Sequence, residues 1–214
     1  MNNHKTLLES VSQKATFKRK FTLLELYRAL VLLPEAMAIL SENHKSKLVH
    51  EHFLERLQLA VTEVNGCAVC SYQHTKMALE QGMSNEEISS FLSGEGSFIK
   101  PEEAKGILFA QHYADTRGFP KRTTYDSIVK EYGSKEARII LSSIQVITVG
   151  NMYGIPFSAL LSRFKGKPYK GSTLFYELGL QIGGLFCLPL AFLHGWLRWV
   201  SNRNKIRFNE STSE

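Results

Sequence analysis

The chain contains 214 residues, of which 43% are hydrophobic and 21% are charged, and its formal net charge is +6. This composition excludes a largely disordered chain, and the length fits one domain with a sizeable core or a core with an appended element. The Lys and Arg residues are spread along the chain without a recognisable nucleic-acid motif, so we expect a solvated or membrane-facing basic surface and no nucleic-acid partner.

The cysteine count indicates the compartment. Three cysteines are an odd number, whereas secreted disulfide frameworks have an even number at dense spacing. Residues 1–20 are basic and lack the apolar stretch of a signal peptide. We therefore expect a cytoplasmic protein, and in that compartment a Cys-x-x-Cys pair is more often catalytic or metal-binding than structural.

Apolar residues recur at helical spacing along almost the whole chain, and strand-like alternation is scarce, which predicts an all-α fold. Pro34 should kink or interrupt the first helix, and Asn65-Gly66 should end the second. Residues 151–170 are expected to be irregular because they contain several Gly and Pro residues. The expected helices cover residues 22–41, 45–63, 67–81, 84–92, 101–116, 122–132 and 135–152. The positions of the second helix that should face the core are Leu48, Phe53, Leu54, Leu57 and Val61.

Residues 178–197 differ from the rest because they contain no Asp, Glu, Lys or Arg. Their length matches a bilayer core, and Trp196, Arg198 and Trp199 resemble the anchors found at membrane interfaces. A buried helix at a subunit interface would have the same composition, so both alternatives remain open. We divide the chain into a polar N-terminal segment (1–20), a helical domain (21–165) and a C-terminal apolar helix with a basic tail (166–214).

The chemistry is expected at Cys67, Cys70 and His74. On a helix that begins near Cys67, these three side chains share one face, so two sulfurs and an imidazole converge. The positive end of a helix and a nearby imidazolium both stabilise a thiolate, which is the nucleophile in peroxide reduction and in disulfide exchange. The alternative is a pair of small buried hydrophobic residues beside a chance histidine. Cys187 stands alone in the apolar segment, where a packing role is expected.

Two carboxylates precede the cysteine pair. Glu55 and Glu63 lie on the preceding helix, which should pack antiparallel to the cysteine helix across the tight turn. A carboxylate there could orient His74 and pass protons through it, although either Glu taken alone is expected to face water. Cys67, Cys70 and His74 with Glu55 or Glu63 could also bind zinc, but the second ligand pair of a usual structural site is missing. Covalent haem attachment is excluded because Ser71, and not His, follows the second cysteine.

At these residues the sequence resembles the carboxymuconolactone decarboxylase-like superfamily, and within it the alkyl hydroperoxidase D branch. The branch pattern is Glu, eleven residues, Cys-x-x-Cys, three residues and His, which corresponds here to Glu55, Cys67, Cys70 and His74. The similarity covers about residues 50–92. True decarboxylases of the superfamily generally lack the cysteine pair, which argues against lactone decarboxylation. One departure is Val69, because the best-known members have a second His directly before the second cysteine.

The resemblance implies a helical alkyl hydroperoxidase D-like fold of antiparallel helix pairs, with the Cys-x-x-Cys motif at the start of a helix. It implies that Cys70 attacks the peroxide, that Cys67 resolves it through a Cys67–Cys70 disulfide, and that His74 and Glu55 form a proton relay. It also implies a homo-oligomer, a trimer or a hexamer. The expected activity is that of a thiol-dependent peroxidase or disulfide reductase, with a small hydroperoxide or disulfide as substrate, an external thiol protein as reductant, and no metal or organic cofactor.

Two other functions remain open at the level of the sequence. The first is a zinc-stabilised interaction module built on the same cysteines. The second is a membrane-associated thiol–disulfide oxidoreductase held by residues 178–197.

Overall fold

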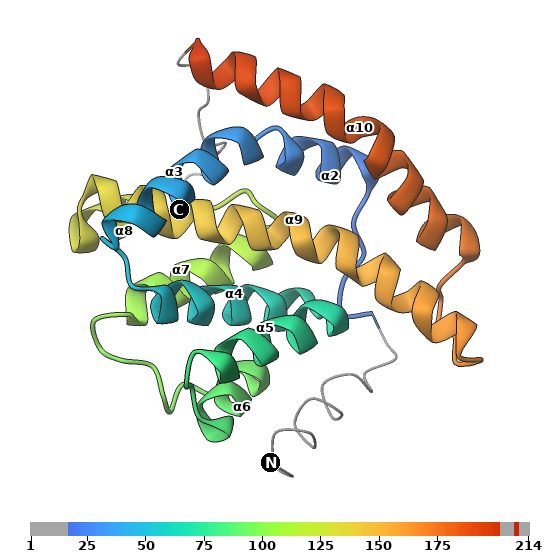
Figure 1. Cartoon of the computed structure of the whole chain (residues 1–214), viewed down its shortest axis with the longest axis horizontal. Coiled ribbons are helices and arrows are strands. Elements are labelled where there is room, and N and C mark those ends of the chain that lie inside the picture. The colour runs from blue at the N-terminus through green and yellow to red at the C-terminus, as the bar shows by residue number, and fades with distance from the viewer. Residues whose placement is uncertain (1–16, 202–207, 210–214) are drawn as a thin grey trace, which may run out of the picture.

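The structure is a computed structural model and describes residues 17–201, 208 and 209. Among these residues helices make up the regular structure, apart from a single bridge between Lys121 and Asn209. The expected all-α class is confirmed (Figure 1). The helices are α2 (Leu23–Leu30), α3 (Leu33–Ser46), α4 (Glu51–Asn65), α5 (Ala68–Glu80), α6 (Asn85–Ser93), α7 (Ala104–Asp115), α8 (Arg122–Tyr132), α9 (Ser134–Phe164) and α10 (Leu174–Val200).

Helix α9 is the centre of the fold. It runs through the middle of the molecule, with α2, α3 and α10 on one side and α4, α5 and α7 on the other (Figure 1). Two hydrophobic clusters pack against it. One cluster joins α4, α6, α7 and α8 to the first half of α9, and the other joins α2, the start of α5 and α10 to its second half. Because its first half belongs to one cluster and its second half to the other, α9 connects the two clusters.

The first expected helix is interrupted, because α2 ends at Leu30 and α3 begins at Leu33 with Pro34 in its first turn. The expected start of the next helix at Lys45 is wrong, since α3 continues to Ser46 and α4 begins at Glu51. Lys47 separates them in the left-handed conformation, with φ 53°. The expectation that Leu48 faces the core is therefore also wrong, and its side chain is 47% exposed.

The expectation that residues 151–170 are irregular is wrong as far as Phe164, where α9 ends. Pro156 lies inside this helix, although its ring removes one backbone donor and disfavours the preceding turn. The helix persists because this segment is packed on both sides, with Ile155, Pro156 and Ala159 all buried. Tertiary burial outweighs the local preference of Gly and Pro here.

Helices α9 and α10 are both long and apolar enough to cross a membrane by length and composition. Of the most apolar 18-residue stretch of α9, 67% is buried inside the molecule, and the core helix of a water-soluble protein has the same property. Of the corresponding 18-residue stretch of α10, only 22% is buried. The division of the chain at residue 165 stays a prediction, and residues 1–16, 202–207 and 210–214 of its two end segments lie outside the described residues.

A partly buried ion pair joins the start of α10 to the end of α9. Arg163 donates to both carboxylate oxygens of Glu177, at 2.7 and 2.8 Å, and the Ser172 hydroxyl donates to the same carboxylate at 2.5 Å. Glu177 itself has no exposed surface. The hydrogen bond from Arg163 is the main cause that holds the pKa of the Glu177 carboxyl below its usual value, against the opposing effect of burial.

This pair makes stability depend on pH. Because the pKa of Glu177 is lower in the folded chain, its contribution is present above the ordinary carboxyl pKa and is lost as the pH falls through the folded value. We expect Glu177→Gln to lower the free energy of unfolding at neutral pH, with a difference from wild type that shrinks in acid. Urea unfolding across a pH series measures this, with the exposed Glu42→Gln as control. A constant difference at every pH would contradict the assignment.

Candidate functional site

The cysteine pair sits where α4 turns into α5. Gly66 ends α4 in the left-handed conformation, with φ 74°, which a residue with a side chain adopts rarely. Cys67 follows as the N-terminal cap of α5, and its sulfur accepts a hydrogen bond from the backbone N–H of Cys70 at 3.3 Å. The two sulfurs are joined in a disulfide, with the Cα atoms 5.3 Å apart. The Cys67–Cys70 pairing that the resemblance implies is therefore present in the structure.

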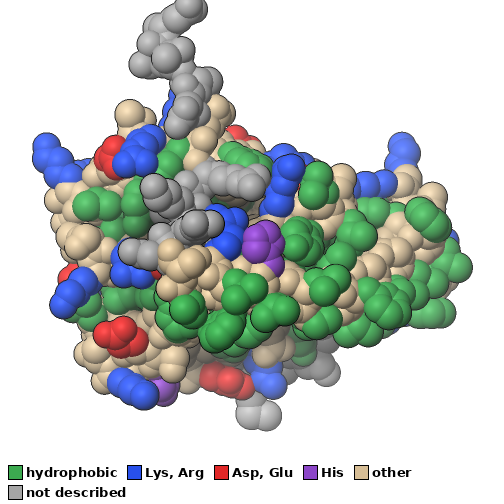
Figure 2. All heavy atoms as spheres, turned by 90° about the horizontal axis from the view of Figure 1, so that it is seen from above, with side chains coloured by type: hydrophobic (Ala, Val, Ile, Leu, Met, Phe, Trp, Pro, Cys, Tyr) green, Lys and Arg blue, Asp and Glu red, His purple; other side chains and the backbone are tan. Residues whose placement is uncertain are grey.

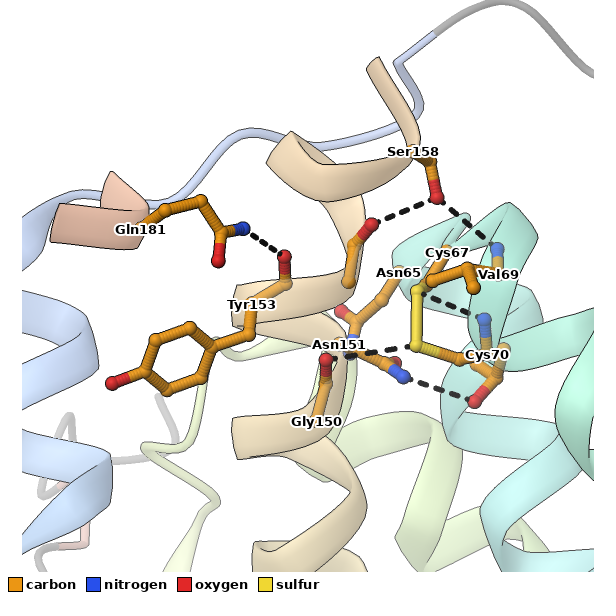
Figure 3. Close-up of a disulfide and its surroundings, with 11 residues drawn as sticks. Asn65, Cys67, Val69, Cys70, Gly150, Asn151, Tyr153, Ser158 and Gln181 are labelled. Carbon is orange, nitrogen blue, oxygen red and sulfur yellow. Dashed lines mark hydrogen bonds between the residues drawn. A yellow bond between two sulfur atoms is a disulfide. The ribbon is translucent and has the colours of Figure 1, made fainter. Parts of the chain in front are cut away.

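Helix α9 lies directly over this disulfide (Figure 3). Gly150, Gly154 and Ser158 follow one another at intervals of four residues and so share one face of the helix. A Cβ atom added to Gly154 would lie 2.5 Å from the sulfur of Cys67 and 2.6 Å from that of Cys70. Only a residue without a side chain leaves room for the two sulfurs at this point.

Polar contacts hold α9 in this position. The Ser158 hydroxyl accepts from the backbone N–H of Val69 at 3.1 Å and donates to the carbonyl of Gly154 at 2.7 Å. It thus satisfies one of the amide groups that the first turn of α5 leaves without a helical partner (Figure 3). Beside it, the buried Asn65 amide donates to Asn151 at 3.0 Å, and Asn151 donates to Thr62 at 3.1 Å.

Glu55 and His74 form the second part of the site. Nδ1 of His74 lies 2.7 Å from the Glu55 carboxylate, across the antiparallel pair α4 and α5. Glu55 is 3% exposed, so the expectation that it faces water is wrong: the carboxylate is buried because the imidazole satisfies it. Glu63 does not join the site, since its carboxylate pairs with Lys18.

The two cysteines are both buried, and they differ slightly in exposure. The residue Cys67 is 0% exposed and the residue Cys70 is 8% exposed. The carbonyl of Gly150 lies 3.6 Å from the Cys70 sulfur, within reach of a thiol proton once the disulfide is reduced. Cys187 is not part of the site: it is a free cysteine, partly buried against the cluster that contains Cys67 and Cys70.

The same geometry bears on zinc. Within the described part of the chain, no three His, Cys, Asp or Glu side chains are grouped so that they could hold a metal ion. The sulfurs of Cys67 and Cys70 bond to each other, and the Glu55 carboxylate is bonded to His74. The four ligands considered from the sequence therefore do not converge on one point.

Sequence reasoning missed the contribution of α9. Gly150, Asn151, Gly154 and Ser158 all lie in or beside the segment that was expected to be irregular after residue 151. A signal was present, because Gly, Gly and Ser at intervals of four residues are typical of a helix face that another backbone approaches closely. The Gly and Pro content of the segment obscured it.

Comparison with known families gives one match. Residues 48–106 match the family model described as the carboxymuconolactone decarboxylase family. This segment runs from the turn before α4 into α7 and contains Glu55, Cys67, Cys70 and His74. No curated protein and no solved structure shows a significant match. The chain is thus similar to this family over the segment that carries the candidate site.

The contact between Gly154 and the sulfurs can be tested with a pair of glycines on the same face. Gly154→Ala should lower the free energy of unfolding by about 1–3 kcal/mol, because its methyl group overpacks the disulfide. Gly150→Ala meets only Ile147 at 3.8 Å, so it should be neutral or stabilise by up to about 1 kcal/mol through its helix propensity. Urea denaturation of both variants measures this, and equal stabilities would refute the close approach.

Proposed function

We propose that this chain is a thiol-dependent peroxidase or disulfide reductase of the alkyl hydroperoxidase D type. The observation that carries the proposal is a Cys67–Cys70 disulfide at the start of α5, with the buried Glu55–His74 pair one helical turn further along the same helix. The family match over residues 48–106 supports it, since the match includes all four residues. We also propose a cytoplasmic homo-oligomer, a trimer or a hexamer, that works without a metal or organic cofactor.

In the proposed oxidation, the Cys70 thiolate attacks the terminal oxygen of a hydroperoxide. The O–O bond breaks, the alkoxide takes up a proton and leaves as an alcohol, and Cys70 becomes a sulfenic acid. Cys67 then attacks the Cys70 sulfur, the S–S bond forms, and the sulfenic hydroxyl leaves with a proton as water. The exposures of the two residues support this order, because Cys67 is fully enclosed and Cys70 keeps a small exposed surface.

In the proposed reduction, a thiolate of an external thiol protein attacks the Cys67–Cys70 disulfide and forms a mixed disulfide. The second thiol of that protein resolves it, so two electrons and two protons return to the pair. With a small disulfide as substrate the same steps run in the opposite direction, and the dithiol of the pair is oxidised. Peroxide and disulfide are therefore two acceptors for one redox pair.

We assign the proton transfers to His74. Glu55 binds Nδ1 of the ring, and Nε2 has no hydrogen-bond partner among the described residues, so this nitrogen is the one left to exchange protons. His74 lies one helical turn after Cys70, which is the spacing at which two side chains on a helix meet. In this role Glu55 holds the orientation of the ring.

The order of attack is tested by trapping sulfenic acid in each single variant. We expect Cys67→Ser to accumulate sulfenic acid at Cys70 after peroxide treatment, because nothing resolves it. Cys70→Ser should accumulate none at Cys67 and should lose turnover with organic hydroperoxides and with model disulfides. Cys187→Ser serves as the matched control and should keep wild-type activity. Sulfenic acid found only at Cys67 would contradict the assignment.

The proton-transfer role is tested with two histidines that each contact a neighbouring side chain. His74→Gln should lower turnover by about 10²–10⁴-fold, the usual contribution of a positioned acid–base group. His194→Gln, whose histidine contacts Tyr27 on the far side of α9, should leave turnover nearly unchanged. Single-turnover oxidation by peroxide measures both rates. A His74→Gln rate equal to that of wild type would exclude His74 from proton transfer.

A further inference from the structure

The outer face of α10 carries the large apolar side chains of this helix. Phe175 is 89% exposed, Phe186 is 72% exposed and Leu193 is 55% exposed. Figure 2, which looks from the α10 side of the molecule, shows hydrophobic side chains gathered over much of this face. A contiguous apolar surface of this kind marks an interaction site, whereas single exposed apolar residues do not. The outer face consists of Phe175, Ile182, Leu185, Phe186, Leu190, Leu193, Trp196, Leu197 and Val200.

The inner face of α10 is built from small residues, so the helix approaches the body closely. A Cβ atom added to Gly195 would lie 2.1 Å from the carbonyl oxygen of Val31, and one added to Gly184 would lie 2.6 Å from the Tyr153 ring. Gln181 adds a hydrogen bond to the carbonyl of Tyr153 at 2.7 Å. Together with the Glu177–Arg163 pair, these contacts attach α10 along its length to α2 and α9.

The attachment of α10 to the body distinguishes between two possibilities, a helix that spans a membrane and a helix that lies on its surface. To span a bilayer, α10 would have to leave the body, which would open the close contacts that Gly184 and Gly195 make with Tyr153 and Val31. A lone spanning helix that had left the body would be surrounded by lipid on all sides, whereas the inner face of α10 is occupied by protein. A helix with one protein-bound face and one apolar face suits the plane of the interface.

The charged residues around α10 indicate what kind of partner its apolar face binds. Lys165, Lys167 and Lys170 are exposed on the loop just before the helix, and Arg198 lies near its other end. Between these ends the only acidic side chain of α10 is Glu177, which is buried. An apolar strip between basic ends is complementary to anionic lipid headgroups above acyl chains.

A second copy of the chain fits this face less well. Because both ends of α10 are basic, pairing two outer faces side by side would bring like charges together, whether the helices run parallel or antiparallel.

The aromatic residues at the C-terminal end of α10 favour lipid instead. Trp196 and Trp199 are side chains that favour the boundary between headgroups and hydrocarbon.

We propose that the outer face of α10 docks in the plane of an anionic lipid bilayer, with its flanking basic residues on the headgroups. The protein then binds the membrane peripherally, and the redox centre lies on the opposite side of α9, away from the lipid. The proposal is independent of the chemistry at Cys67 and Cys70.

Cosedimentation of the full chain with vesicles tests this proposal. We expect binding to vesicles of phosphatidylcholine with phosphatidylserine, weaker binding to phosphatidylcholine alone, and release from the anionic vesicles at high salt. The double variant Phe186→Glu, Leu193→Glu should lower the partition coefficient about tenfold or more, because two large side chains no longer enter the acyl region. Leu108→Glu on α7, which places the same charge at a 61% exposed leucine far from α10, should bind as wild type does.

The basic ends are tested separately. Changing Lys165, Lys167 and Lys170 to Ser should lower binding to the anionic vesicles about tenfold or more and leave binding to phosphatidylcholine little changed. A matched triple change of Lys76 on α5, Lys100 in the loop before α7 and Lys130 on α8 should have a small effect, because neither α5 nor α8 is among the helices packed against α10. Circular dichroism and thermal unfolding establish that each variant is folded.

Two results would overturn the proposal. One is a folded wild-type chain that does not cosediment with either vesicle. The other is an oligomer that the Phe186→Glu, Leu193→Glu variant dissociates in sedimentation velocity without any change in vesicle binding, which would assign the face to a second copy of the chain.

Discussion

The site depends on the close contact between α9 and the Cys67–Cys70 disulfide. Gly154 makes this contact possible, because a side chain there would occupy the space of the two sulfurs. Ser158 then joins the backbone of α9 to the first turn of α5, and Asn151 joins α9 to the end of α4. One helix thus encloses the cysteine pair and also separates it from α10. The enclosure leaves Cys67 fully buried and Cys70 with a small exposed surface, a difference in the direction of the proposed order of attack.

The sequence predicted the parts of the fold that depend on local signals. Gly66 and the cysteine spacing placed the start of α5 correctly, and the helical period established the all-α class. The sequence-based prediction failed where packing overrides local preference. Helix α9 continues through Pro156, because the residues around it are buried on both sides of the helix. The prediction also failed at Leu48, where a short loop replaces the expected helix start. Neither packing nor loop geometry is visible in the periodicity of one chain.

The candidate site was predicted in its residue types and not in its surroundings. Helical geometry alone brought Cys67 and Cys70 together, and the resemblance supplied Glu55 as the partner of His74. Taken alone, a Glu on a helix is expected in water, and only the imidazole that faces it across two helices explains its burial. Gly150 of α9 lies 80 residues after Cys70 in the sequence, and Gly154 lies further still, so no local pattern connects these glycines to the cysteines.

The most direct test of the account is a redox titration of the cysteine pair in the full chain, with alkylation and mass mapping of the peptides. We predict that Cys67 and Cys70 become alkylated together under a mild dithiol and are protected together after peroxide, with a loss of two hydrogens from their peptide. Cys187 should remain open to alkylation in both states of the unfolded, quenched chain. Cysteines that stay alkylatable after peroxide, or that are held by stoichiometric zinc, would contradict the account.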